Sequence, residues 1–95
     1  MNYKEFEQKA KEMGFIKKKY AYIIPEYFGK EIKFPLLFSK HGRVGFSYKS
    51  KDKNIEYIIF RWIFDSAFIT NPITYEEGLE RMEQAKRLIE LWRNY

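Results

Sequence analysis

The sequence predicts an α+β domain: an N-terminal helix, a three- to four-stranded antiparallel sheet, and a long C-terminal helix packed on one face of the sheet. Two observations support this prediction. Amphipathic periodicity with capping residues appears at both ends of the chain, and the middle is rich in β-branched and aromatic residues separated by turn residues. Because 95 residues suffice for one hydrophobic core, we expect a single domain over 1–95.

The first helix is predicted between Asn2 and Gly14. Asn2 is a suitable N-cap, with Glu5 three residues later in the reciprocal capping position. Gly14 is typical of a left-handed helix end. Spacings of three and four produce one apolar stripe, which consists of Tyr3, Phe6, Ala10 and Met13.

Three strands are predicted next. YAYII (20–24) is the first, and PEYFGK (25–30) after it reads as a turn. EIKFPLLFSK (31–40) is the second; because Pro35 has no amide donor, we expect this strand at an edge or with a bulge. HGR (41–43) predicts a tight connection to VGFSY (44–48), and KSKDKN (49–54) a second turn. Alternation places two sets of side chains on one face each: Ile32, Phe34, Leu36 and Phe38, then Val44, Phe46 and Tyr48.

The segment IEYIIFRWIF (55–64) is apolar on both faces and is compatible with two structures. Its β-branched and aromatic content favours a central strand, which is our prediction. A short buried helix is the alternative, because Ile55, Ile59, Trp62 and Ile63 also follow a helical stripe. DSAFITNPI (65–73) is predicted to be irregular.

The last helix is predicted to begin at a capping box formed by Thr74 and Glu77. Gly78 disfavours a helix by about 1 kcal/mol, and we expect it to allow close packing against the sheet. The apolar stripe of this helix consists of Leu79, Met82, Ala85, Ile89 and Trp92.

Composition excludes several classes of site. The chain has no cysteine and one histidine, which argues against a disulfide framework and a zinc site. It has neither a phosphate-binding glycine loop nor a nucleophile elbow, so we predict no enzymatic activity and no cofactor. Its first residues lack the apolar stretch of a secretory signal, and no apolar run approaches a membrane span. We expect a cytoplasmic protein that binds neither metal nor membrane.

Positive charge is concentrated in the middle of the chain. The net charge is +5, and residues 30–53 alone contribute +5, whereas residues 54–95 contribute −2. Because Lys and Arg bind phosphates, we predict a non-enzymatic module that contacts nucleic acid or a nucleoprotein complex through a basic β-hairpin surface. The predicted contacts are Lys40, His41, Arg43, Lys49, Lys51 and Lys53, with Lys17, Lys18 and Lys19 as secondary contacts.

A protein partner is the first alternative. The chain would then be a stoichiometric inhibitor or accessory factor, of the kind that phages and mobile elements encode, acting on a larger machine. Tyr27 and Phe28 would be its anchors, with Trp92 and Tyr95 as weaker candidates. Tyr27 and Phe28 fit equally well as cover for the end of the core.

A ribonuclease toxin that works without a metal is a more remote alternative. His41 would act as general acid or base, Lys40 and Arg43 would stabilise the phosphorane, and Tyr48 would lie nearby.

The helix–strands–helix order is also similar to that of the double-stranded-RNA-binding domain. That family holds phosphates with basic residues at the start of its last helix. TYEEGLERME at this position is acidic and would repel them, so the sequence does not fit that family.

Overall fold

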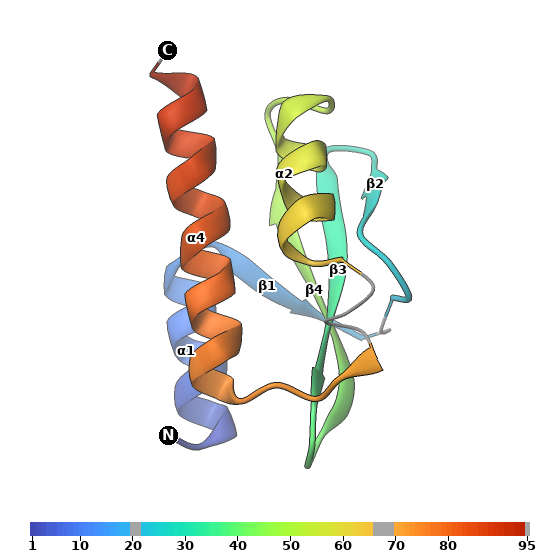
Figure 1. Cartoon of the computed structure of the whole chain (residues 1–95), viewed down its shortest axis with the longest axis vertical. Helices are drawn as coiled ribbons and strands as arrows, with labels where there is room; N and C mark the ends of the chain where they lie inside the picture. Colours follow the sequence, from blue (N-terminus) through green and yellow to red (C-terminus); the bar gives the residue numbers. More distant parts are fainter. Residues whose placement is uncertain (20–21, 66–69, 95) are drawn as a thin grey trace.

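The computed structural model describes residues 1–19, 22–65 and 70–94. Three helices and four strands follow one another along these ranges (Figure 1). Their bounds are α1 (Tyr3–Glu12), β1 (Phe15–Lys18), β2 (Glu26–Phe28), β3 (Glu31–Phe38), β4 (Gly42–Lys49), α2 (Ile55–Ile63) and α4 (Tyr75–Arg93).

The four strands form one antiparallel sheet in the order β1-β4-β3-β2, which confirms the predicted α+β class. β3 and β4 form a hairpin that pairs from Glu31 opposite Lys49 to Phe38 opposite Gly42. Gly42 follows the tip of this hairpin with a φ of 67°, a conformation that favours glycine. β1 and β2 lie at the two opposite edges of the sheet.

The helices cover one face of the sheet, and the core lies between the two layers (Figure 1). The predicted alternation in β3 and β4 is confirmed, because the side chains assigned to the inner face are buried or pack against the core. α4 runs beside both α1 and α2, so it closes the helical layer. The largest fully buried apolar side chains are Phe6, Phe15, Phe34, Phe38, Phe46, Phe60, Phe64, Ile32, Leu36, Met82 and Ile89.

Both terminal helices begin where the sequence predicts. The Asn2 side chain accepts the amide N–H of Glu5 at 2.9 Å, and Thr74 Oγ1 accepts that of Glu77 at 3.1 Å. The expected role of Gly78 is also confirmed. A Cβ atom at this position would lie 3.2 Å from a ring carbon of Phe6 and 3.3 Å from the ring of Phe38. Glycine therefore lets the start of α4 approach the core closely.

The predicted central strand at 55–64 is wrong, because Ile55–Ile63 is helix α2. Local carboxylates favour this outcome. Asp52 Oδ1 accepts the amide N–H groups of Asn54 and Ile55, both at 2.9 Å, and so satisfies donors that a helix start leaves without partners. Packing of Phe60 and Ile63 on the sheet then stabilises the helix against its β propensity.

Two further predictions in the first half of the chain need correction. Residues 20–21 of the predicted strand YAYII lie outside the described residues, and 22–24 are not in a strand; the strand lies earlier, at Phe15–Lys18. Within the predicted turn PEYFGK, Glu26–Phe28 forms the short edge strand β2. Both errors have one cause: these segments are strands only because the β3–β4 hairpin offers its two edges for pairing.

We expected Pro35 in an edge strand or at a bulge, but it lies in the inner strand β3. Its surroundings explain why proline is tolerated there. β2 begins at Glu26, opposite Lys33, so among the described strands none pairs with β3 at Pro35 on that side. Beyond Pro35, the Ile73 amide donates to Leu37 O at 2.8 Å and restores a neighbour. The missing donor of Pro35 therefore interrupts no ladder on that side.

Candidate functional site

The six main contacts predicted from sequence do not form one surface. Lys40 and His41 lie in the tip of the β3–β4 hairpin and Arg43 one residue beyond Gly42, whereas Lys49, Lys51 and Lys53 lie at or beyond the other end of β4. An eight-residue strand separates the two groups by about 23 Å at roughly 3.3 Å per residue. A single phosphate-binding hairpin tip is therefore not what the fold presents.

His41 joins three elements of the fold. Its ring stacks on Tyr3 of α1 with 4.1 Å between the centroids, and its Nδ1 lies 2.8 Å from the hydroxyl of Tyr75 in α4. Tyr48, which the ribonuclease hypothesis places near His41, does not lie beside it. Tyr48 lies near the far end of β4 against Phe60, where burial raises the pKa of its hydroxyl. His41 thus has a structural role between the hairpin and both terminal helices.

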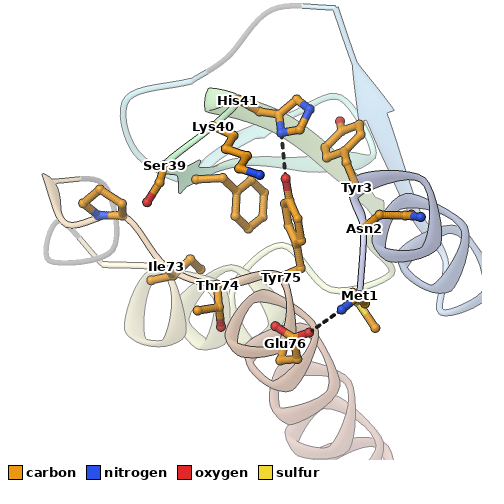
Figure 2. Close-up of a pocket in the computed structure, with 12 residues that line it drawn as sticks. Met1, Asn2, Tyr3, Ser39, Lys40, His41, Ile73, Thr74, Tyr75 and Glu76 are labelled. Atoms are coloured by element: carbon orange, nitrogen blue, oxygen red, sulfur yellow. Dashed lines mark hydrogen bonds and ion pairs between the residues drawn. The ribbon is translucent and has the colours of Figure 1, made fainter.

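An open pocket of about 580 Å³ lies beside His41 (Figure 2). We call it the His41 pocket; it is lined by Met1, Asn2, Tyr3, Phe38, Ser39, Lys40, His41, Pro72, Ile73, Thr74, Tyr75 and Glu76. Several of its polar groups are already paired with one another, including the Met1 ammonium and Glu76 Oε1 at 3.2 Å. The pKa of Glu76 is lowered, first by the hydrogen bond with its own backbone and then by the Met1 ammonium.

The secondary cluster Lys17–Lys19 also divides between surfaces. Lys17 extends toward α1, where Nζ lies 5.1 Å from the ring centroid of Tyr3 and 4.0 Å from Glu7. Lys18 points to the opposite face of the sheet and pairs with Glu31 at 3.3 Å. Lys19, at the end of this run, is exposed and takes part in an interaction of its own.

Part of the predicted basic surface lies together at the other end of the sheet. The β2–β3 turn lies beside the loop after β4, since the Ser50 amide donates to Lys30 O at 2.8 Å. Tyr27 and Phe28 point to opposite faces of β2: Tyr27 packs against the core, and Phe28 is 68% exposed. Of this predicted pair only Phe28 is accessible as an anchor. We call the lysines at this end of the sheet the basic end; they are Lys30, Lys33, Lys49, Lys51 and Lys53.

Apolar side chains gather at a second hollow, between α2 and α4. We call it the α2–α4 groove; it has a volume of about 510 Å³ and is lined by Ile55, Ile58, Ile59, Trp62, Leu88, Leu91 and Trp92. Four of these residues are largely exposed: Ile58 by 64%, Trp62 by 68%, Leu91 by 66% and Trp92 by 53%. The two indole side chains alone expose roughly 300 Å², which reaches the size of apolar patches that often have a function.

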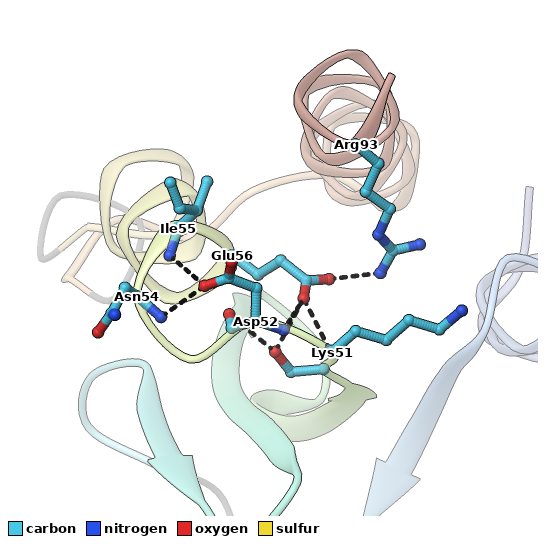
Figure 3. Close-up of polar contacts among 7 residues, drawn as sticks. Lys51, Asp52, Asn54, Ile55, Glu56 and Arg93 are labelled. Carbon is cyan, nitrogen blue, oxygen red and sulfur yellow. Dashed lines mark hydrogen bonds and ion pairs between the residues drawn. The ribbon is translucent and has the colours of Figure 1, made fainter. Parts of the chain in front are cut away.

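A buried carboxylate fixes the relative position of the two helices that form the groove (Figure 3). Glu56, near the start of α2, is buried; it accepts the amide N–H groups of Lys51, at 2.7 Å, and of Asp52. Its Oε1 lies 2.6 Å from the guanidinium of Arg93, near the end of α4. These contacts join the loop, α2 and α4 next to Trp92. They hold the two helices that line the groove in a fixed relative position.

Sequence reasoning placed Trp92 on the buried stripe of the last helix and ranked it as a weak anchor, and it missed Trp62. A signal for the groove was present. Seven of the nine residues in Ile55–Ile63 are apolar or aromatic, and one face of a helix cannot bury all of them against a single sheet. Tyr95, the other weak candidate, lies outside the described residues.

In the part of the chain that the structure describes, no three His, Asp or Glu side chains gather as metal ligands would. Within the same ranges, no helix combines the length and apolar character that crossing a bilayer requires. Neither a protein-family model, nor a curated protein, nor a solved structure matches the chain.

Proposed function

We propose that this protein is a protein-binding module, an inhibitor or accessory factor, whose contact surface is the α2–α4 groove. The observation that supports it is the placement of both tryptophans of the sequence, Trp62 and Trp92, in one exposed apolar hollow. Tryptophan is enriched among the residues that dominate protein–protein binding energy. Water contact with these side chains is unfavourable, and a partner that covers them would remove it.

Affinity capture from the native host, after nuclease treatment, tests this proposal. The wild-type protein should retain a stoichiometric partner, and the double variant Trp62→Ala, Leu91→Ala should lose it. Phe28→Ala is the matched control, because Phe28 is as exposed as Trp62 but lies at the far edge of the sheet. A partner that the groove variant still retains, or that Phe28→Ala also loses, would contradict the proposal.

Contact with nucleic acid is the second candidate function, and the basic end favours it. Five lysines lie at that end of the sheet. The Lys33 ammonium is 4.8 Å from the Phe28 ring centroid, and the Lys53 ammonium is 5.7 Å from that of Tyr27, on the other face of β2. Lysines next to an exposed ring are the groups that contact phosphates and bases in single strands. Affinity for a single strand or a duplex should fall steeply with salt. No binding by micromolar protein at about 50 mM salt would remove this candidate.

A further inference from the structure

We infer that the α2–α4 groove receives an amphipathic helix of its partner whose apolar stripe is flanked by acidic residues. This inference rests on the proposed function and names the chemistry of the partner at the same groove. Shape and charge each support it.

The shape of the groove matches one helix. α2 and α4 run side by side in opposite directions (Figure 1), and the lining residues follow helical spacing on each: Ile55, Ile58, Ile59 and Trp62, then Leu88, Leu91 and Trp92. The nine residues of α2 extend about 13 Å, the length of two to three helical turns. The ridge of side chains along a third helix packs into such a groove through positions i, i+3 or i+4, and i+7.

A second copy of this chain fits the same surface poorly. A two-fold dimer through this surface would place groove against groove, because both subunits use the same patch in such a dimer. Two concave surfaces leave unfilled space between them. The arginines at the margins would also meet arginines of the other copy, which is unfavourable.

Charge at the margins favours acidic flanks on the partner. Arg61 follows Ile58 by three residues on α2, and Arg87 precedes Leu91 by four on α4, so helical spacing places each arginine next to a groove residue. Both are exposed, and the described part of the chain pairs neither with a carboxylate. Arg61 instead donates to the Tyr57 hydroxyl at 3.1 Å. A guanidinium binds a carboxylate through two parallel hydrogen bonds, so Asp or Glu is the expected neighbour.

The acidic residues of α4 do not cancel this pattern. Glu83 and Glu90 are exposed, but helical spacing places them farther round α4 from the groove than Arg87. Asp65, one turn after Arg61, takes part in an interaction of its own. The charged helix residues nearest to the apolar lining are therefore Arg61 on α2 and Arg87 on α4.

Two designed helical peptides test the inference directly on the whole protein. Both carry leucines at i, i+4, i+7 and i+11; one has glutamates and the other lysines beside this stripe. Because the protein has only two tryptophans and both line the groove, their fluorescence reports its occupancy, provided the peptides contain no tryptophan. We expect a blue shift with the glutamate peptide. Its affinity should be about tenfold or more above that of the lysine peptide at low salt, with the ratio shrinking as salt screens the charges.

Three variants locate the binding. Leu91→Ala keeps both reporters and should weaken the glutamate peptide at least about tenfold. The double variant Arg61→Glu, Arg87→Glu should reverse the preference between the peptides, and Phe28→Ala should leave the affinity for both peptides unchanged. Circular dichroism checks that each variant is folded.

Three results would overturn the inference: no blue shift with the glutamate peptide, equal affinity for the two peptides at low salt, or a concentration-dependent dimer that Trp62→Ala disrupts. If the peptides fail while host capture still depends on Trp62 and Leu91, the proposed function stands and only the helical, acidic partner is wrong. If capture is independent of the groove, the proposed function itself fails.

Discussion

The His41 pocket and the α2–α4 groove are similar in size, about 580 and 510 Å³, but they differ in chemistry. In the His41 pocket, aromatic and polar groups contact one another: His41 stacks on Tyr3, and its ring nitrogen bonds the Tyr75 hydroxyl. In the groove, aliphatic and indole side chains face solvent, Trp62 by 68%. The first hollow is where three elements join; the second presents an apolar surface that the described fold does not cover.

This difference shows why a pocket rich in His, Lys and Tyr is not automatically the site. In the His41 pocket, His41 is paired with Tyr75 and the Met1 ammonium with Glu76, so these contacts already contribute to stability, although the buried Tyr3 hydroxyl has no hydrogen-bond partner in the described part of the chain. Apolar groups in the groove gain free energy only when something covers them. Substitutions at the two hollows should therefore separate stability from binding.

The largest expected effect separates two aromatic residues of α2, one buried and one in the groove. Phe60→Ala should lower the free energy of unfolding by about 4 kcal/mol, because it leaves a cavity among the rings of Phe15, Phe34 and Phe64. Trp62→Ala should change it by less than about 0.5 kcal/mol. Urea denaturation measures both. A loss above about 2 kcal/mol in Trp62→Ala would mean that the groove serves the fold.

Glu56→Ala should cost about 3 kcal/mol, since it leaves the amides of Lys51 and Asp52 without an acceptor and Arg93 without its carboxylate. The groove should loosen with it, which the tryptophan emission reports together with urea denaturation. Glu83→Ala, on the exposed side of α4, is the control and should stay within about 0.5 kcal/mol of the wild type. An equal loss in both variants would remove the special role of Glu56.

Gly78→Ala should destabilise the protein by about 1 to 2 kcal/mol. The gain in helix propensity is about 1 kcal/mol, but the new methyl group would overpack against the buried rings of Phe6 and Phe38, which line the core beside the His41 pocket. Thermal unfolding measures the change, with Glu80→Ala in the same helix as control. A stabilised Gly78→Ala variant would show that the rings of Phe6 and Phe38 can shift to make room for the methyl group.

Tyr75→Phe has the smallest expected effect, about 1 kcal/mol, because it removes one hydrogen bond at an exposed site, that with His41 Nδ1. A double-mutant cycle with His41→Ala isolates this bond from the stacking of His41 on Tyr3. Additive losses in the cycle would show that the bond contributes nothing. Neither variant should alter binding of the glutamate peptide at the groove.

Local signals in the sequence determined the ends of the molecule and its central hairpin. Asn2 and Thr74 cap their helices through neighbours three residues away, and the alternation in β3 and β4 needs only a period of two. Gly42 marks the hairpin turn by its own backbone conformation. Such interactions lie within a few residues of one another, so composition and spacing alone predict them.

For the segment 55–63, tertiary structure added to a local signal that the sequence prediction missed. Asp52 caps the start of α2 from two and three residues away, whereas the packing on the sheet and the contact of Glu56 with Arg93, 37 residues farther along, exist only in the folded chain. Tertiary structure also decided the fate of the candidate site. The β4 strand separates Lys40 from Lys49, although both belong to one basic stretch of sequence. Which apolar residues remain exposed depends on how much surface the sheet and α4 can cover. Proximity and burial are properties of the packed chain as a whole, so the groove emerged only when distant segments were placed side by side.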